Sequence, residues 1–251
     1  MSKTAWYIGC REDEVGEAAL LVGDRARIDR IAEHLEKPYF PLENRGLRTV
    51  TGYRAGRRVT ATAFGMGGPI AAIVLHELFD LGVRRFLRVG TAMATPPAKL
   101  GDFVVAEGAM RTEGTSLTYA PLGYPAIADF GLVAALRAEL GRRGAPWRVG
   151  LFGAYDGFYT EMFSLSEGQA QPIERQRREN QRLGLIATDM ETATLLVAGR
   201  VLGARVGALC LATVDSLTQK KLDAPALSES ERRMFEIALD AIVATPSPEG
   251  S

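Results

Sequence analysis

Residues 188–195 read TDMETATL, and a long apolar stretch, LLVAGRVLGARVGALCLATV, occupies residues 195–214. The threonine or the aspartate at the start can cap a helix that begins near Met190, and Glu191 suits its positively polarised first turn. The end of the apolar stretch has the composition of a strand. A short strand, a buried helix and a second strand in this order are typical of an α/β fold. A solvated turn would also explain the paired acids Asp189 and Glu191.

Strand-like and helix-like segments alternate along the rest of the chain. We expect strands within 18–23, 57–68, 84–90, 102–111, 147–156, 185–190 and 207–214, and helices over 27–37, 69–82, 130–144, 166–183 and 228–244. Ser228 or Ser230 can cap the last helix. The pattern predicts one α/β domain over residues 1–244, with a mostly parallel or mixed central sheet flanked by helices. We expect a disordered tail over residues 245–251.

The composition excludes several classes of function. The 251 residues include 30 basic and 30 acidic side chains, which argues against nucleic-acid partners. Arg200 and Arg205 interrupt the longest apolar stretch, so it does not predict a membrane span of about 20 residues. Two cysteines give no disulfide framework and fit a reducing cytoplasm. The two histidines, His34 and His76, lie in predicted helices, which argues against a three-ligand metal site or a Ser-His-Asp triad.

Two predicted strand ends are candidate anion sites, because ligands of open α/β sheets bind beyond the carboxyl ends of the strands. Residues 23–27, GDRAR, open a helix whose free N–H groups suit phosphate oxygens, as does an arginine. Arg88, in the strand FLRVG, is costly to bury unless it pairs with an acid such as Glu191 or with a ligand. The turn at 65–68 lacks the GxGxxG spacing, which argues against a dinucleotide cofactor.

Five stretches in order resemble the nucleoside phosphorylases of the hexameric type, and within them the uridine phosphorylase branch. They are VGDRARIDRIA (22–32), FGMGGPIAAIVLHEL (64–78), GVRRFLRVGTA (82–92), SLTYAPLGYPAIADF (116–130) and DMETATLL (189–196). The resemblance covers nearly all of residues 5–243. It implies the three-layer fold of these enzymes, with a central mixed sheet. It also implies phosphorolytic cleavage of a nucleoside's N-glycosidic bond, giving ribose 1-phosphate and a free base.

The resemblance assigns roles to individual residues. Phosphate contacts map onto Gly23, Arg27, Arg88 and Thr91, with Arg45 supplied by a neighbouring subunit. Ribose contacts map onto Glu191, Met190 and, from across a dimer, Tyr7, and base contacts map onto Phe158, Met162, Met93 and Asp215. The candidate catalytic residues are Asp215, Glu191 and Arg88.

Such a site needs no metal and no cofactor, because inorganic phosphate is the co-substrate. The Glu191 carboxylate can accept hydrogen bonds from both ribose hydroxyls, and the Met190 thioether offers the sugar an apolar wall. The bound phosphate anion stabilises the oxocarbenium character of the sugar in the transition state. Of the two neighbouring acids, Glu191 alone need point inward. A site shared between subunits predicts a homodimer as the smallest unit, and three dimers then form a hexamer.

The base pocket departs from the uridine phosphorylase pattern. Met162 stands where the family has a glutamine that reads uracil, and Met93 replaces a glycine. Ser164 and Ser216 stand where the family has arginines. A pocket reads a pyrimidine edge through placed donors and acceptors, so these changes argue against tight recognition of uracil.

Asp215 points to another class of base. Purine-cleaving members of the family carry an aspartate in this loop that protonates the departing base, and Asp215 ends the last predicted strand. General-acid catalysis needs a carboxyl that can donate a proton as the base leaves. A turn acid or a helix cap would explain Asp215 equally well. We therefore expect a base pocket that favours a purine or an unusual base.

Two other functions fit parts of the sequence. A hydrolytic nucleosidase of the same fold would use water in place of phosphate, and the retained phosphate-site arginines would then have no purpose. A non-catalytic nucleoside-binding paralogue would explain the altered base pocket but not the retained Glu191.

Overall fold

The computed structural model describes residues 3–246, except for the side chains at 167 and 169. Its helices are α1 (Ala26–Ala32), α2 (Gly68–Asp80), α3 (Phe130–Arg142), α4 (Glu167–Arg182), α5 (Thr192–Leu202) and α6 (Ala224–Ala244). Its strands are β1 (Ala18–Val22), β2 (Glu36–Tyr39), β3 (Thr49–Arg54), β4 (Arg57–Ala63), β5 (Arg85–Ala94), β6 (Phe103–Arg111), β7 (Ala126–Ile127), β8 (Trp147–Ala154), β9 (Leu185–Asp189) and β10 (Arg205–Asp215). Short helical turns are η1 (Glu12–Glu14), η2 (Thr115–Thr118) and the π-helical η3 (Phe158–Met162).

A mixed sheet runs through the centre of the molecule, in the order β10-β6-β8-β9-β5-β1-β4-β3-β2. β5 also pairs with β10, so the strands from β10 to β5 close into a barrel from which β1, β4, β3 and β2 extend. β5 runs parallel to β1 and β10, and its end pairs antiparallel with β9. Side chains near the end of β5 are therefore surrounded by other strands.

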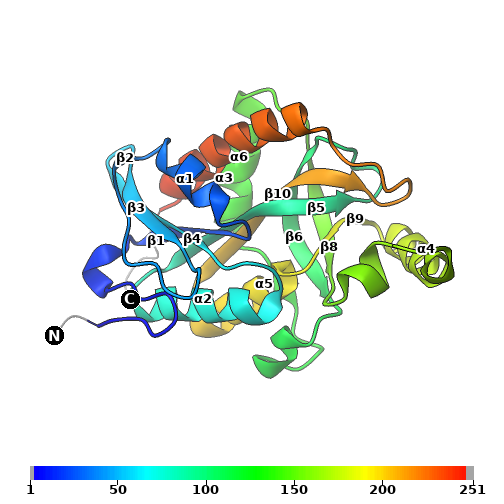
Figure 1. Cartoon of the computed structure of the whole chain (residues 1–251), viewed down its shortest axis with the longest axis horizontal. Helices are drawn as coiled ribbons and strands as arrows, with labels where there is room; N and C mark the ends of the chain where they lie inside the picture. Colours follow the sequence, from blue (N-terminus) through cyan, green and yellow to red (C-terminus); the bar gives the residue numbers. More distant parts are fainter. Residues whose placement is uncertain (1–2, 247–251) are drawn as a thin grey trace.

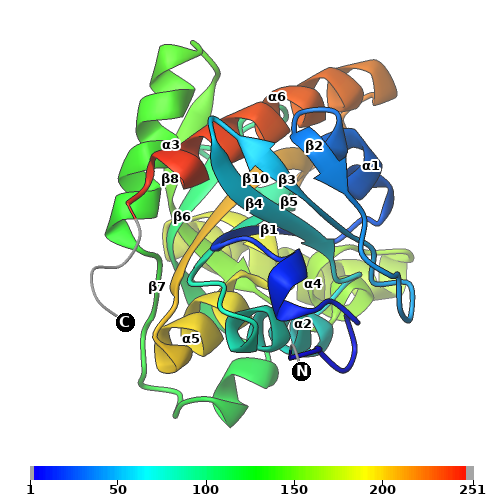
Figure 2. The ribbon, with the colours of Figure 1, turned by 90° about the vertical axis from the view of Figure 1, so that its left-hand side faces the viewer.

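Helices cover both faces of the sheet (Figures 1 and 2). In Figure 1, α1, α3 and α6 lie along one face, α2 and α5 lie along the other, and α4 stands beyond the end of β8. Residues Thr192–Gly199 of α5 are all buried, as expected for a helix covered on every side. A Cβ on Gly199 would lie 2.1 Å from Val206 Cγ2, so glycine permits α5 to pack closely on β10. The predicted α/β domain with a central mixed sheet is confirmed.

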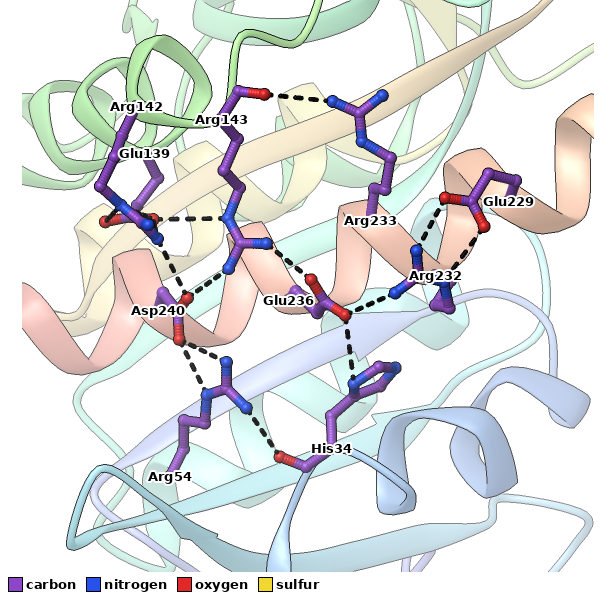
Figure 3. Close-up of polar contacts among 10 residues, drawn as sticks. All are labelled: His34, Arg54, Glu139, Arg142, Arg143, Glu229, Arg232, Arg233, Glu236 and Asp240. Carbon is purple, nitrogen blue, oxygen red and sulfur yellow. Dashed lines mark hydrogen bonds and ion pairs between the residues drawn. The ribbon is translucent and has the colours of Figure 1, made fainter.

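A network of ion pairs ties α6 to α3 and to the β2–β3 region (Figure 3). Arg143 donates to Glu236 at 2.6 Å and to Asp240 at 2.5 Å. Asp240 also pairs with Arg54 at 2.8 Å, and His34 Nδ1 lies 3.8 Å from Glu236. Isolated exposed pairs contribute little to stability, whereas a linked network with fixed geometry orients the elements that it joins. His34 thus has a structural position.

The first helix is shorter than the sequence predicts. A helix over 27–37 is wrong beyond Ala32, because Glu36–Tyr39 forms the strand β2 and Lys37 has a φ of +50°. β2 pairs antiparallel with β3, a strand that the sequence pattern does not predict. β3 joins β4 through Ala55 and Gly56, both with positive φ, which is the geometry of a two-residue hairpin turn.

The last helix begins earlier than the sequence predicts. Asp223, rather than Ser228 or Ser230, is its N-cap, because the Asp223 carboxylate accepts a hydrogen bond from Ala226 N at 2.8 Å. Pro225 fits the first turn, where no backbone donor is required.

The predicted disordered tail is wrong for its first two residues. Thr245 is buried, and its carbonyl oxygen accepts a hydrogen bond from Arg57 at 3.3 Å. The Pro246 carbonyl oxygen accepts one from Arg205 at 2.7 Å. The rest of the predicted tail, residues 247–251, lies outside the described residues.

Candidate active site

Arg88 lies at the centre of the candidate site and is buried in β5. Its side chain is 5% exposed, and in the strand register it stands beside Leu21 of β1 and Ala208 of β10. A Cβ on Gly90 would lie 2.0 Å from Arg88 Nη1. The guanidinium therefore occupies space that any other residue at position 90 would fill.

Two acids and a thiol hold the Arg88 guanidinium. Its Nε lies 3.0 Å from Asp189 Oδ2, its Nη1 donates to Cys210 Sγ at 3.0 Å, and its Nη2 pairs with Glu191. Glu191 Oε1 in turn accepts a hydrogen bond from the Gly67 backbone N–H at 2.7 Å. The end of β9, the start of α5, the middle of β10 and the turn before α2 thus converge on one arginine.

Asp189 faces inward together with Glu191, so the expectation that Glu191 alone need do so is incomplete. The Asp189 side chain is 1% exposed. Its Oδ1 accepts a hydrogen bond from Thr192 N at 3.2 Å, and its Oδ2 accepts one from Thr192 Oγ1 at 2.5 Å. Asp189 therefore holds the first turn of α5, which begins at Thr192 and not near Met190, while it also pairs with Arg88.

Burial and mutual charge set the ionisation of this cluster. Burial lowers the pKa of Arg88, but Asp189, Cys210 and Glu191 outweigh it and raise that pKa above its ordinary value. Burial raises the pKa of Asp189, while Arg88 opposes the rise. Burial also raises the pKa of the Cys210 thiol to about 12. Arg88 is thus a fixed cation and Cys210 a neutral thiol near neutral pH.

A hollow of about 310 Å³ lies beside this cluster. Gly23, Gly65, Arg45 and Tyr7 are among the residues that line it. The Arg45 guanidinium lies 5.1 Å from the centroid of the Tyr7 ring, and Gly65 N donates to the Gly23 carbonyl at 3.0 Å. Because Gly67 binds Glu191, the short turn from Gly65 to Gly67 connects the hollow to the Arg88 cluster.

Four of the seven residues predicted to contact the sugar and the base lie in one apolar cluster, whereas Glu191, Tyr7 and Asp215 lie outside it. Met93 and Met162 are buried, and Met190 and Phe158 pack against them. The Phe158 ring stacks on Phe163 with 5.8 Å between ring centroids and 9° between planes. Thioether and aromatic side chains together offer an adaptable flat wall, which suits a planar heterocycle.

A sequence profile of the phosphorylase superfamily matches residues 17–244. The chain belongs to this superfamily. It is 32% identical over 248 residues to uridine phosphorylase from Escherichia coli K12, covering 96% of this chain and 98% of that protein. It is 35% identical over 205 residues to guanosine phosphorylase from Halorubrum lacusprofundi, covering 81% and 80% of the two chains.

A solved structure has the same fold over the same length. The crystal structure of uridine phosphorylase from Vibrio fischeri, complexed with 6-hydroxy-1-naphthoic acid, superposes with a TM-score of 0.85. The two sequences are 28% identical, and the match covers 96% of this chain and 97% of that one. These similarities place the chain in the uridine phosphorylase branch of the nucleoside phosphorylases.

Within this superfamily scaffold, the predicted phosphate contacts lie in neighbouring places and not in one cluster. Gly23 and Arg45 meet at the hollow, and Arg88 and Thr91 lie on β5. Arg27 is buried in α1, where its Nε donates to Glu231 Oε1 at 2.9 Å. The Arg27 side chain is therefore oriented by α6 in this structure.

Asp215 closes the turn that follows β10. Its Oδ1 accepts hydrogen bonds from Leu217 N at 3.0 Å, Thr218 N at 2.7 Å and Thr218 Oγ1 at 2.9 Å. Its backbone N–H donates to the Lys220 carbonyl at 2.9 Å. These contacts show that the Asp215 carboxylate stabilises the turn. Oδ1 accepts all three of the side-chain hydrogen bonds.

Sequence reasoning does not single out Cys210, although it contacts Arg88. The feature that could have identified it is the strand pairing. Cys210 of β10 pairs with Gly90 of β5, and the Arg88 guanidinium fills the space where a side chain at position 90 would lie. The sequence pattern also misses Arg177 of α4, which contacts the backbone of Met162.

Among the described residues, no group of three or more His, Cys, Asp or Glu side chains could hold a metal ion. In the same part of the chain, no helix is both long and apolar enough to cross a bilayer.

Proposed function

We propose that this chain cleaves the N-glycosidic bond of a nucleoside with inorganic phosphate and releases ribose 1-phosphate and a free base. The observation that carries the proposal is the buried Arg88–Glu191 pair, held by Gly67 beside the cluster of Met93, Met190 and Phe158. Relatives named uridine phosphorylase and guanosine phosphorylase support it.

Glu191 anchors the sugar in this proposal. Each of its carboxylate oxygens uses one acceptor position, on Arg88 and on the Gly67 N–H. A carboxylate has about four acceptor positions, so it can still receive hydrogen bonds from the 2′- and 3′-hydroxyls of ribose. Met190 follows Asp189 directly and presents its thioether to the same space as Phe158.

The reaction is a displacement at the anomeric carbon. A phosphate oxygen forms the new bond as the carbon–nitrogen bond breaks, and the electron pair of that bond passes to the base. The sugar gains positive charge on the way, which the nearby phosphate anion stabilises. The anion is held in line for attack by Gly23, Arg27, Arg88 and Thr91, together with Arg45 of the partner subunit. No metal or other cofactor takes part.

The altered base pocket favours a purine or an unusual base over uracil. Met162 is buried in the apolar cluster, and the Ser164 hydroxyl donates to the Ser166 carbonyl at 2.7 Å. Neither side chain offers a donor to a pyrimidine edge. In this proposal Asp215 enters the reaction as a protonated carboxyl group, with its proton on the oxygen that does not close the turn, and it gives that proton to the departing purine and becomes a carboxylate.

A hydrolytic nucleosidase is the second candidate, because one observation favours it. Arg27 pairs with Glu231, and Arg88 pairs with Asp189 and Glu191, so phosphate must compete with internal acids for both arginines. Water would face no such competition.

The proposed active unit is a homodimer, and three dimers form a hexamer. Large apolar side chains next to lining residues of the hollow are exposed: Trp6, beside Tyr7, is 80% exposed, and Met66, beside Gly65, is 84% exposed. Asn44 Nδ2 donates to the Trp6 and Tyr7 carbonyls at 3.2 and 2.9 Å, which joins this surface to Tyr7. Exposed apolar patches mark subunit contacts.

We further propose a cytoplasmic role in nucleoside salvage.

The deciding experiment is base release from uridine, thymidine, cytidine, inosine, guanosine and adenosine, each with and without inorganic phosphate. Phosphate-dependent release of hypoxanthine or guanine is the expected result. Phosphate-dependent release of uracil alone would overturn the base assignment, and release that ignores phosphate would establish the nucleosidase. No release from any nucleoside would contradict both enzymatic candidates.

A further inference from the structure

The segment after η3 leaves the base end of the apolar cluster without a polar side chain of its own. Met162 contributes a buried thioether, and the Ser164 hydroxyl is turned to the Ser166 carbonyl. A pocket lined in this way binds a flat ring by contact alone. It would not distinguish one heterocycle from another of the same shape.

An arginine from another element reaches this segment. Arg177, on α4, is 8% exposed, and its Nη2 donates to the Met162 carbonyl oxygen at 3.2 Å. Gln219, in the turn after β10, completes the arrangement. With its amide oriented to satisfy both neighbours, its oxygen accepts hydrogen bonds from Ser164 N at 3.0 Å and from Arg177.

The Arg177 guanidinium is incompletely satisfied. Its Nε is buried and has no hydrogen-bond partner among the described residues. Its protein acceptors are neutral, namely a backbone carbonyl and an amide oxygen. A guanidinium has five N–H donors, and leaving one buried without an acceptor is costly. The Nε is shielded, but both protein acceptors use Nη2, so other N–H groups of the guanidinium remain for an acceptor that the protein does not supply.

Space for such an acceptor lies next to it. Ser164, Arg177 and Gln219 are among the residues that line a hollow of about 840 Å³ between α4 and the turn after β10. Glu174 lines the same hollow, and the charges of Glu174 and Asp215 both act on Arg177. Two nearby acids disfavour an anionic ligand at this point. They leave a neutral carbonyl oxygen as the better partner.

We propose that Arg177 and Gln219 are the specificity residues of the base pocket and that they recognise a carbonyl oxygen on the edge of the base remote from the sugar. The matching substrates are nucleosides of 6-oxopurines, in line with the proposed preference for a purine, and any 4-oxopyrimidine nucleoside that is cleaved would be selected through the same oxygen. Bases of the same shape without that oxygen leave the Arg177 donor unpaired. This inference rests on the proposed nucleoside phosphorylase function, and it deepens that function by naming the group that selects the base.

The test compares substrates that differ in that one oxygen. Inosine is paired with purine riboside, and uridine with pyrimidin-2-one riboside, in the presence of phosphate. For each pair, the ratio of kcat/KM values is measured for the wild type and for Arg177→Met. We expect the variant to lower the ratio about 10- to 100-fold for the pair that is turned over, mainly through KM, because a charge-assisted hydrogen bond is lost. Arg177→Lys should restore part of the ratio.

The matched control is Arg182→Met. Arg182 is the last residue of α4, its side chain is 69% exposed, and it pairs with Glu179 at 2.6 Å away from the hollow. The proposal is overturned if Arg182→Met changes the ratio as much as Arg177→Met does. It is also overturned if Arg177→Met lowers activity on both members of a pair by the same factor, because a merely structural arginine would do so.

A second variant guards against misfolding of Arg177→Met. Gln219 has a φ of +57°, which asparagine tolerates, so Gln219→Asn shortens the side chain while keeping the turn. It should lower the same ratio.

Calorimetric binding of hypoxanthine and of purine gives a readout without turnover. If wild-type protein releases no base but binds hypoxanthine more tightly than purine through Arg177, the proposed reaction fails and this inference stands. Equal binding of the two bases overturns the inference.

Discussion

Glu191 and Gly67 are 124 residues apart in the sequence, yet Glu191 Oε1 accepts a hydrogen bond from the Gly67 N–H at 2.7 Å. The other Glu191 oxygen pairs with Arg88. The starts of α2 and α5 therefore meet through one carboxylate, which leaves its remaining acceptor positions for a ligand. The glycine-rich turn at 65–68 thus lies against the proposed sugar anchor.

Replacing Glu191 by alanine should abolish most activity without unfolding the chain. The change removes the proposed anchor for the ribose hydroxyls, and a misplaced substrate can cost a factor of about 100 in rate. Asp189 remains 3.0 Å from Arg88 Nε, so the buried cation keeps a partner. Steady-state rates with a cleaved nucleoside and a thermal melt check both parts.

The matched control for this change is Glu229→Ala. The Glu229 side chain is 59% exposed and pairs with Arg232 at 2.7 Å on the outer surface of α6. It should leave the rate unchanged. A Glu191→Ala enzyme as active as this control would remove Glu191 from the mechanism.

Gly90→Ala should displace the Arg88 guanidinium. A Cβ at position 90 would lie 2.0 Å from Arg88 Nη1, in a buried strand where the backbone cannot move freely. We expect a loss of about 1–3 kcal/mol in the free energy of unfolding, as for other overpacked sites, and a loss of activity. Gly123→Ala is the control, because no atom lies within 4 Å of a Cβ there. Urea titration would contradict this expectation if both variants unfolded at the same midpoint.

The parts of the site that the sequence predicts are those carried by local patterns. Arg88 can be placed in a strand because FLRVG reads as one, although β5 continues to Ala94 and Arg88 lies in its first half, so the predicted strand end is wrong. Glu191 can be placed at a helix start because the apolar stretch follows it. The family resemblance adds Met93, Phe158 and Met162, which the structure brings into one cluster.

Contacts between distant residues could not be predicted in this way. Arg27 and Glu231 are 204 residues apart, and no local pattern pairs them. The edge strand β2 could not be predicted for a similar reason, because Glu36 and Lys37 continue the helical pattern of 27–37 and become part of a strand only through its pairing with β3. The inward orientation of Asp189 could not be predicted either, because it depends on the ion pair with Arg88, and the assembly of the barrel brings the two residues together.

The two buried thiols should make the protein less stable above pH 9. Burial raises the pKa of Cys210 from 9.0 to about 12, and burial raises that of Cys10 from 9.0 to about 11. Above pH 9 the unfolded chain releases these protons while the folded chain keeps them. Stability therefore falls with rising pH, by up to about 1.4 kcal/mol per pH unit for each thiol.

Urea unfolding at pH 8, 9, 10 and 10.5 measures this loss. Other groups titrate in the same range, so the comparison is with Cys10→Ala and Cys210→Ala, each of which should show a shallower fall than the wild type. Identical slopes for all three proteins would mean that neither thiol is protected from ionisation.

Trp6→Asp should separate the proposed dimer and lower activity with it. Trp6 is 80% exposed and stacks on Tyr7, with 6.1 Å between ring centroids. A charge in the apolar surface around the hollow opposes its burial against a second subunit. Sedimentation velocity should show a smaller species than the wild type. Leu183→Asp, at the end of α4, is the control for a charge on an exposed apolar residue and should leave the assembly intact. A wild-type chain that is monomeric and fully active would refute the shared site.

Asp215→Asn should separate a general acid from a turn residue. Asparagine keeps the oxygen that accepts from Leu217 N and Thr218, so the turn after β10 should persist. It cannot supply the proton of a carboxyl group, and general-acid help is worth about 100-fold or more in rate. Release of a purine base should therefore fall by about that factor, whereas release of a pyrimidine, if the wild type shows any, should fall much less. Thr218→Val is the matched control, because it removes the two hydrogen bonds of the Thr218 hydroxyl, to Asp215 and from Lys220 N, and leaves the carboxyl group in place. If Asp215→Asn and Thr218→Val slow both classes of nucleoside equally, Asp215 acts through the turn and the proton comes from elsewhere.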